Sequence, residues 1–452
     1  MKPILIIQLQ RMGDVILTYP LWVWLLKVYP NHPIIFFVEE QIVKQVKDFF
    51  PQATFFSWSQ LSFVLNQKYF LSINLSHREE AARLNYKVQA EEKFGYIQNE
   101  QNELFVLGKW QLYRASLVNN NRYNGFHWAD LNGLDVIPWD RMRSLKWNQI
   151  QFRPKSVKTI GFVLGASRPR KTPTLSFWLK LTKWALEGGY RPFFLGGVNE
   201  KKMANYILKK YNLPDSLNLA ASFDLKSFAK AICFFDLIIT PDTGPMHIAC
   251  FMARPVLNIS LGNVSPWDTG PYLPGNLVLR RYTSCFPCWT CSKDYACKYN
   301  FPWESVKNMF NDNLDHLIQE KTILYQVTRK NGLFTLSPKT NVDSQYEQSL
   351  RDFWWFFFGN ILGLWKEKQL ALTIRFPSVR KTLSQQTYLC LKQVKDVLTQ
   401  KSVEPDFWEK FEPCFWPLSS YLTLLWQNHN FDSKVVASSI RILEKLLYCL
   451  RD

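Results

Sequence analysis

The chain has 452 residues, of which 47% are hydrophobic and 16% aromatic, so it can hold two or three domains with large cores and is not of the disordered class. Its 55 Lys and Arg residues against 37 Asp and Glu residues give a net charge of +18. This charge favours a negatively charged partner, such as a nucleic acid, an anionic membrane or a phosphorylated substrate. Nine cysteines in a chain of this length argue against a secreted disulfide scaffold.

The first part of the chain alternates strand and helix patterns. A strand pattern runs from Pro3 to Leu9 and stops at a polar turn, after which an apolar helix pattern runs from Val15 to Val28. Two further strand patterns cover residues 34–38 and 71–75. The alternation predicts a parallel sheet wound with helices, which we expect to form a first domain over residues 1–154.

A second alternation begins at Lys158. Its strand patterns cover residues 159–164, 191–195, 234–239 and 256–261, and its helix patterns cover residues 176–187, 200–211 and 303–327. Strands of both units end in polar or glycine turns, which predicts two Rossmann-like domains facing each other across a cleft. We expect the second domain to span residues 155–330, closed by the helix at 303–327.

The character of the sequence changes after about Lys330. Residues 330–345 are polar and predict a linker. Apolar residues at three- and four-residue spacing then predict helices at residues 346–366, 378–400, 416–428 and 432–450. We therefore expect a separate all-helical extension over residues 346–452, whose role the pattern does not indicate.

The first ten residues contain an apolar run far shorter than a signal-peptide core. The longest near-continuous apolar run, Phe353 to Trp365, is interrupted by two glycines and an asparagine and is too short to span a bilayer. We expect a cytoplasmic protein, with any membrane contact peripheral.

The turn after the strand at 234–239 has the features of an anion site. Asp242 or Thr243 can cap the following helix, and Gly244 lets a ligand approach the backbone. We expect free N–H groups at Met246 and His247 to face the carboxyl end of the strand, where a phosphate can bind without a metal. An ordinary capped helix after a strand is the alternative.

Three segments together carry a resemblance to a known family: QRMGDVILTYP at residues 10–20, DTGPMHIA at residues 242–249 and GNVSPWDTGP at residues 262–271. In this order and at these separations, they resemble glycosyltransferase family 9, the ADP-heptose:lipopolysaccharide heptosyltransferases, over about residues 1–330. The resemblance implies an α/β fold of the GT-B type, two Rossmann-like domains facing across a cleft, here with a C-terminal all-helical extension. The first domain is expected to bind the acceptor and the second the nucleotide-sugar.

The resemblance implies an inverting reaction that needs a base on the acceptor side. Asp14 matches the general base of the family and would take the proton from the attacking hydroxyl, an effect typically worth ~10²–10⁴-fold in rate. Its carboxylate can instead cap the helix from Val15, or do both.

The departing diphosphate needs positive charge directed at it. The family places a Lys before a Trp-Pro pair, whereas residues 167–173 here read SRPRKTP, with Thr172 in place of the Trp. The role then falls on Arg170 or Lys171, of which we favour Lys171. A solvated basic turn is the alternative.

Glu200 matches the acidic residue of the family that is thought to hold the ribose hydroxyls, and it can equally be a first-turn Glu favoured by the helix dipole. His247 is expected to contact the diphosphate, because no further ligand stands at metal-binding spacing from it. The chain has no Asp-x-Asp motif. We therefore expect no cofactor beyond the ADP-sugar donor and no essential metal.

Basic residues of the first domain fit an acceptor rich in carboxylate and phosphate, as inner-core lipid A is. The residues that we expect to bind the acceptor are Arg11, His77 and Arg78. Of these, Arg78 is the strongest candidate. The remaining basic candidates include Arg83, Arg114, Arg122, His127, Arg141, Arg143 and Lys146.

Four cysteines cluster late in the second domain: Cys285, Cys288, Cys291 and Cys297. Their number suits zinc, but their spacing is not that of two separate Cys-x-x-Cys knuckles, so it favours free or structural thiols.

The family resemblance implies a glycosyltransferase that moves a heptose, or a related sugar, from an ADP-sugar to the lipopolysaccharide core at the cytoplasmic face of the inner membrane. A different nucleotide-sugar donor or a protein acceptor is the first alternative. A basic nucleic-acid-binding α/β protein is the second, but the chain shows no recognition signature, so we expect no nucleic-acid partner.

The run from Phe353 to Phe358 is too aromatic for a solvated helix. Burial within the protein is one interpretation, and insertion at a membrane interface is the other. The second draws on flanking basic residues: Arg351, Lys366, Lys368, Arg375, Arg380 and Lys381.

Overall fold

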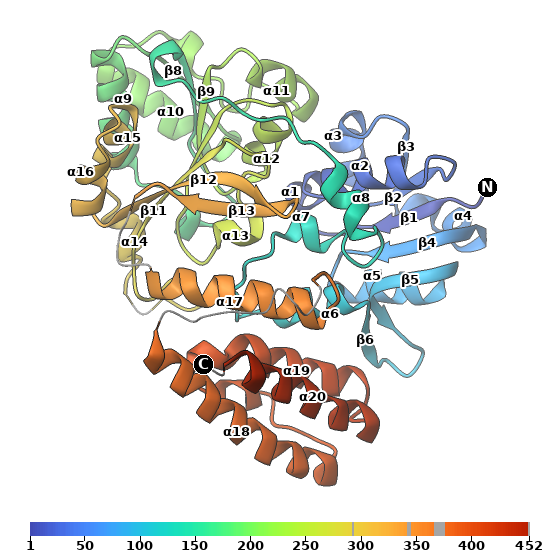
Figure 1. The fold of residues 1–452 in the computed structure, drawn as a ribbon. Coiled ribbons are helices and arrows are strands. Elements are labelled where there is room, and N and C mark those ends of the chain that lie inside the picture. The colour runs from blue at the N-terminus through green and yellow to red at the C-terminus, as the bar shows by residue number, and fades with distance from the viewer. Residues whose placement is uncertain (292, 341–344, 366–375, 451–452) are drawn as a thin grey trace.

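The computed structural model describes residues 1–291, 293–340, 345–365 and 376–450. Two sheets, one formed within residues 4–107 and the other within residues 159–338, stand side by side. A group of helices from the C-terminal part of the chain lies beneath them in the view of Figure 1. The α/β class, the two Rossmann-like sheets and the C-terminal helical region agree with the prediction.

The first sheet has six strands in the order β3-β2-β1-β4-β5-β6. The strands are β1 (Ile4–Ile7), β2 (Ile34–Phe37), β3 (Ala53–Phe56), β4 (Lys68–Asn74), β5 (Gln89–Gln98) and β6 (Leu104–Leu107). All neighbouring strands of this sheet pair in parallel except β5 and β6, which are antiparallel. The central strand β1 is buried along its whole length, because helices cover both faces of a parallel sheet.

The second sheet has seven strands in the order β13-β12-β11-β10-β9-β7-β8. The strands are β7 (Thr159–Val163), β8 (Arg191–Leu195), β9 (Leu237–Pro241), β10 (Val256–Ile259), β11 (Leu277–Arg281), β12 (Thr322–Lys330) and β13 (Leu333–Pro338). The strands from β8 to β11 are parallel, and β12 and β13 add an antiparallel edge.

Helices flank both sheets. Those of the first unit are α1 (Met12–Ile16), α2 (Tyr19–Val28), α3 (Glu40–Val46), α4 (Leu61–Asn66), α5 (Glu79–Lys87), α6 (Lys109–Ser116), α7 (Trp128–Leu131) and α8 (Trp139–Ser144). Those of the second are α9 (Leu175–Glu187), α10 (Val198–Tyr211), α11 (Leu225–Ile232), α12 (Gly244–Phe251), α13 (Pro266–Thr269), α14 (Ala296–Tyr299), α15 (Glu304–Phe310) and α16 (Leu314–Gln319). The extension contains α17 (Gln345–Ile361), α18 (Pro377–Gln400), α19 (Trp416–Asn428) and α20 (Ser433–Cys449).

The end of the second unit differs from the prediction in two places. The helix expected at 303–327 is instead the pair α15 and α16 followed by β12, because Asp312 has a positive φ of 53° and Asn313 caps α16. The expected linker after residue 330 is instead a hairpin. Asn331 and Gly332 have φ values of 52° and 84°, as a two-residue hairpin turn requires, so the sheet continues to Pro338.

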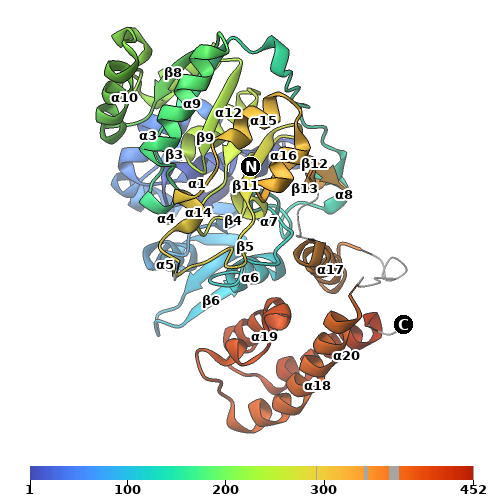
Figure 2. The same cartoon turned by 90° about the vertical axis from the view of Figure 1, so that its left-hand side faces the viewer.

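The extension packs against the first unit and is not separate from it. Asn428 on α19 pairs with the backbone of Val106 on β6, accepting from its N–H at 2.5 Å and donating to its carbonyl at 3.1 Å. The hydroxyl of Ser420 donates to the carbonyl oxygen of Ser116 on α6 at 2.7 Å. In both Figure 1 and Figure 2, α17 lies between the sheets and the bundle of α18, α19 and α20.

The aromatic run on α17 is buried within the protein, which confirms the first interpretation. All of its side chains are buried except that of Phe356, which is half-buried. Arg351 is also buried, so it does not face a lipid surface, and Lys366, Lys368 and Arg375 lie outside the described residues. No helix of the described part combines the length and apolar character needed to cross a bilayer.

Candidate active site

The polar turns of the two sheets meet at a pair of glycines. A Cβ atom built on Gly13, in α1, would lie 3.4 Å from the Cα atom of Gly244, the first residue of α12. A Cβ atom on Gly244 would lie 2.6 Å from the Cε atom of Met12. Because neither residue has a side chain, the two backbones can approach closely, and the residues that follow them are brought to one place.

Asp14 stands on the first-sheet side of this contact. Its Oδ2 atom accepts a hydrogen bond from the backbone N–H of Arg11 at 3.2 Å, so it caps α1, as one of the two expectations stated. Burial raises the pKa of Asp14, and the Arg114 guanidinium is the strongest influence that lowers it. In the second unit, Lys171 also lowers the pKa of Asp14 and Asp242 raises it. A carboxylate of raised pKa is a better proton acceptor than an ordinary one.

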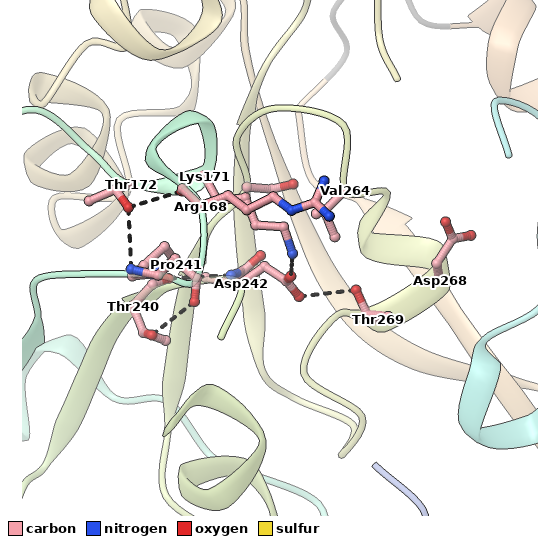
Figure 3. A network of polar contacts seen from close by, with 12 residues as sticks. Arg168, Lys171, Thr172, Thr240, Pro241, Asp242, Val264, Asp268 and Thr269 are labelled. Carbon is pink, nitrogen blue, oxygen red and sulfur yellow. Dashed lines mark hydrogen bonds and ion pairs between the residues drawn. The ribbon is translucent and has the colours of Figure 1, made fainter. Parts of the chain in front are cut away.

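Lys171 and Asp242 form an ion pair on the second-sheet side. The Nζ atom of Lys171 lies 2.8 Å from Asp242 Oδ2, and the two side chains are 18% and 10% exposed. The hydroxyl of Thr269 donates to the other carboxylate oxygen at 3.0 Å. Figure 3 shows both groups converging on Asp242. The ammonium of Lys171 has three donors, so it can hold Asp242 and still bind a phosphate oxygen.

The two basic candidates of this turn are held differently. The hydroxyl of Thr172 accepts from the Ala166 N–H at 3.2 Å, which closes the turn and leaves Lys171 directed at Asp242. Arg170 instead donates from Nη1 to the carbonyl oxygen of Trp289 at 3.0 Å. The structure therefore brings Lys171, and not Arg170, to Asp242.

The start of α12 differs from the prediction. Thr243 occupies the cap position without a side-chain hydrogen bond, and Asp242 is engaged by Lys171 and Thr269 instead. The backbone N–H of Met246 donates to the Thr243 carbonyl at 3.0 Å, so it is not free.

His247 is buried beside this ion pair. Its imidazole is 5% exposed, and its Nδ1 atom has no hydrogen-bond partner among the described residues. Burial lowers its pKa to about 4, an effect that Asp242 opposes. A neutral imidazole offers a phosphate a hydrogen bond but no charge.

Glu200 lies where β7 and β8 end. Its Oε2 atom accepts from the Gly197 N–H at 2.8 Å, so it caps α10, and its side chain fills the space that a Cβ atom would need at Gly165 and Gly196. The capping role is thus observed, and the contact with a ribose stays a prediction.

The acceptor-side residues have different hydrogen-bond partners, although the charges of Asp14, Arg78 and Arg114 all act on His77. Arg78 donates to the carboxylates of Glu39 and Glu80 and to the Leu9 carbonyl, so its guanidinium is occupied in holding α5 and the end of β1. The Nδ1 atom of His77 lies 2.5 Å from the Gln10 amide nitrogen. His77 and Arg11 are both exposed.

Arg114 is the basic residue that the sequence did not single out. From α6 it donates to Asn132 Oδ1 at 2.8 Å, its guanidinium lies 5.1 Å from the centre of the Trp128 ring, and it acts electrostatically on Asp14 and His77. Nothing in the local pattern separates it from the other basic residues, because its proximity to Asp14 depends on how α6 packs.

The four clustered cysteines line one pocket of about 270 Å³. Burial, together with the other three thiols, raises the pKa of Cys288 to about 11. All nine cysteines are free thiols, and within the described residues no group of three or more potential ligands is arranged to hold a metal. The zinc alternative stays a prediction.

Comparison with protein-family models decides the family. The model of glycosyltransferase family 9 (heptosyltransferase) matches residues 62–298, more than half of the chain. The chain belongs to glycosyltransferase family 9. The protein is therefore a glycosyltransferase with a nucleotide-sugar donor and a glycan acceptor, and its two Rossmann-like sheets form the GT-B architecture. The match includes neither the Asp14 turn nor the C-terminal extension.

Solved structures of family 9 enzymes and related proteins resemble this one. ADP-heptose lps heptosyltransferase II of E. coli has a TM-score of 0.49 and 19% identity, covering 69% of this chain and 99% of that chain. A family 9 glycosyltransferase from Veillonella parvula has a TM-score of 0.42 and 19% identity, covering 60% and 83%. The iron-containing dodecameric glycosyltransferase TibC of enterotoxigenic E. coli has a TM-score of 0.42 and 10% identity, covering 70% and 77%. No curated protein matches the chain.

Proposed function

We propose that this family 9 enzyme transfers a heptose, or a related sugar, from an ADP-sugar to an anionic lipopolysaccharide core. The observation that carries the proposal is the contact of the two turns, which places the Asp14 carboxylate opposite the Lys171 and Asp242 pair. A base on one sheet and a cation on the other are the two charges that an inverting transfer needs.

The residues divide the reaction between them. The acceptor oxygen attacks the anomeric carbon on the face opposite the ADP, its proton passes to the Asp14 carboxylate, and the carbon–oxygen bond to the diphosphate breaks. Lys171 supplies positive charge where the diphosphate leaves, a role that a metal ion has in other transferases. Arg114 lies on the acceptor side, where a carboxylate or phosphate of the acceptor would meet it. The net charge of +18 also favours an acceptor that carries negative charge.

The test is a transfer assay on the purified protein. ADP-heptose, ADP-glucose and UDP-glucose are offered with a deacylated inner-core oligosaccharide, with and without EDTA, and products are identified by mass. We expect a product with one added heptose whose rate EDTA does not change. Transfer from another nucleotide-sugar alone would favour the first alternative. Loss of activity with EDTA and recovery with added metal would contradict the metal-free mechanism.

We also propose that the enzyme acts in the cytoplasm at the inner membrane, because a lipid-anchored core acceptor is presented there. The excess of basic residues supports a peripheral contact with anionic lipid. Fractionation of cells that express the tagged protein tests this location. We expect the protein in the membrane fraction at low salt and in the supernatant after a high-salt wash.

A further inference from the structure

Helix α17 brings two charged side chains into the interior of the molecule. Arg351 is 3% exposed and Glu347 is 8% exposed, although both lie on a helix whose aromatic side chains already anchor it. Burying a charge is costly unless it is paired. The partners of these two residues therefore show what the helix holds in place.

Arg351 packs on α13. Its guanidinium lies 3.5 Å from the centre of the Trp267 ring, and Nη2 donates to the Arg122 carbonyl at 3.1 Å. Arg351 also attracts Asp268, the residue after Trp267. Glu347 accepts from Nη2 of Arg122 at 2.7 Å, which fixes α17 against the same region.

Helix α13 connects this contact to the donor side of the site. Asp268 accepts from the amides of Asn121 and Asn124 of the first unit, at 2.5 and 2.7 Å. The next residue, Thr269, holds Asp242, the partner of Lys171. Figure 3 shows the side chain of Asp268 pointing away from the Lys171 and Asp242 pair, while that of Thr269 points to it. Because α13 has only four residues, Trp267 cannot shift without moving Thr269.

We propose that Arg351 is a positioning residue for donor binding: α17 fixes α13, and α13 orients Asp242 and Lys171 through Thr269. The proposal rests on the proposed function for the role of Lys171. One observation argues against a role in packing alone. The Nε atom of Arg351 is buried without a partner in the described part of the chain, a cost that an apolar side chain on the same aromatic surface would avoid.

The test compares Arg351→Met, Arg351→Lys, Thr269→Val and the double variant Arg351→Met with Thr269→Val in the full-length protein. Ser439→Ala is the control, since it removes the buried hydrogen bond that Trp426 of α19 donates to Ser439 of α20, both within the extension. Titration with ADP, donor KM, kcat and thermal midpoints are measured for each.

We expect Arg351→Met to weaken ADP binding and raise donor KM about tenfold, which corresponds to 1.4 kcal/mol, with a smaller change in kcat. Arg351→Lys recovers part of the affinity, because it restores the charge without the planar stacking. We expect Thr269→Val to have a similar effect on ADP binding. The double variant should bind ADP no more weakly than the single variant that has the lower ADP affinity. The control lowers the thermal midpoint but leaves ADP affinity unchanged.

Two results would overturn the proposal. One is an ADP affinity of Arg351→Met that matches the control, and the other is full additivity of the two single variants. The same four proteins, which are the wild type, the two single variants and the double variant, are also compared in thermal unfolding without nucleotide. This double-mutant cycle tests the linkage between Arg351 and Thr269 independently of the donor. A wild-type protein that binds no nucleotide would contradict the proposed function, and coupling in that unfolding cycle would still support the linkage.

Discussion

Two carboxylates near the contact of the sheets, Asp14 and Asp268, both have pKa values raised by burial, but their neighbours suit them to different roles. Asp14 is half-buried and stands among the charged side chains of Arg114, Lys171 and Asp242. Asp268 is 3% exposed and is held by two asparagine amides. We propose proton transfer as the role of Asp14 and structural bridging between the two units as the role of Asp268.

Asp14→Asn should abolish most of the turnover and leave donor binding intact. The amide keeps the shape of the side chain but cannot take the acceptor proton, so we expect kcat to fall by ~10²–10⁴-fold. Asp140→Asn, on an exposed carboxylate of α8, is the control and should leave kcat unchanged. Steady-state kinetics and ADP titration measure both variants. Weakened ADP binding with normal turnover would rule out the base role.

Lys171→Met should weaken nucleotide binding more than Arg170→Met does. A hydrogen bond to a charged group is worth ~1.5–3 kcal/mol, so we expect a loss of about 10- to 150-fold in ADP affinity. Arg170 donates to a backbone carbonyl and should matter less. Isothermal titration with ADP gives both values. Equal affinities in wild type and Lys171→Met would place the phosphate site elsewhere.

Asp268→Asn should change how stability depends on pH. The folded-state pKa of Asp268 is raised to about 7, mainly by burial, above an unfolded value of about 3.9. The protonated form is favoured in the folded state, so this contribution to stability is complete below the unfolded pKa and is lost as pH rises through 7.

We therefore expect the unfolding free energy of the wild type, relative to Asp268→Asn, to fall between pH 4 and pH 7 and to level off above that range. The difference between the two ends is on the order of 4 kcal/mol at most. Urea unfolding at pH 4.5, 6 and 8 measures it, and groups such as His247 cancel because both proteins contain them. Parallel curves for the two proteins would show that Asp268 does not titrate differently in the folded state.

At the scale of elements, α17 joins parts of the molecule that its position in the chain does not suggest. Phe358 packs against Tyr113 of α6 and Tyr421 of α19, with ring centres 4.5 and 5.5 Å apart. Trp355 stacks on Phe126, with ring centres 5.8 Å apart. The extension therefore shares a hydrophobic core with the first unit.

Phe358→Ala should destabilise the whole first unit together with the extension. Removal of a fully buried aromatic ring typically costs 3–5 kcal/mol, about what we expect here. Phe356→Ala, on the half-buried neighbour, is the matched control and should cost less. Thermal unfolding followed by circular dichroism and by tryptophan fluorescence should show one transition that shifts in both signals. A variant in which only part of the signal shifts would show that the extension unfolds separately.

At the scale of the whole molecule, the burial of the aromatic run changes what kind of membrane contact we expect. With the run inside the protein, binding to a membrane depends on the excess positive charge and not on inserted aromatic side chains. Such an attraction is screened by salt, since the Debye length is about 10 Å at 0.1 M and about 3 Å at 1 M.

The protein should therefore sediment with vesicles that contain phosphatidylglycerol at low salt and be released at high salt. Vesicles of phosphatidylcholine alone are the control and should not bind it. Sedimentation over a range of salt concentrations measures the effect. Binding to neutral vesicles that survives high salt would mean that apolar side chains insert, against the burial of the aromatic run.

The sequence by itself determined the features that depend on neighbouring residues. Strand and helix periodicity predicted the two sheets and the helices of the extension, and the spacing of three short segments identified the family. The hairpin at Asn331 and Gly332 could also have been predicted, because an Asn-Gly pair is a local sequence signal for a turn with two positive φ angles. The polar character of the segment obscured this signal.

Only the tertiary structure decided which side chains meet. It placed Arg114 and not Arg78 beside Asp14, paired Lys171 with Asp242, and set Arg351 of the extension on Trp267. The physical reason is that periodicity reports which face of a strand or helix is buried, but not which other element covers that face. Contacts between residues far apart in the chain follow from packing, and packing depends on the fit of all the elements at once.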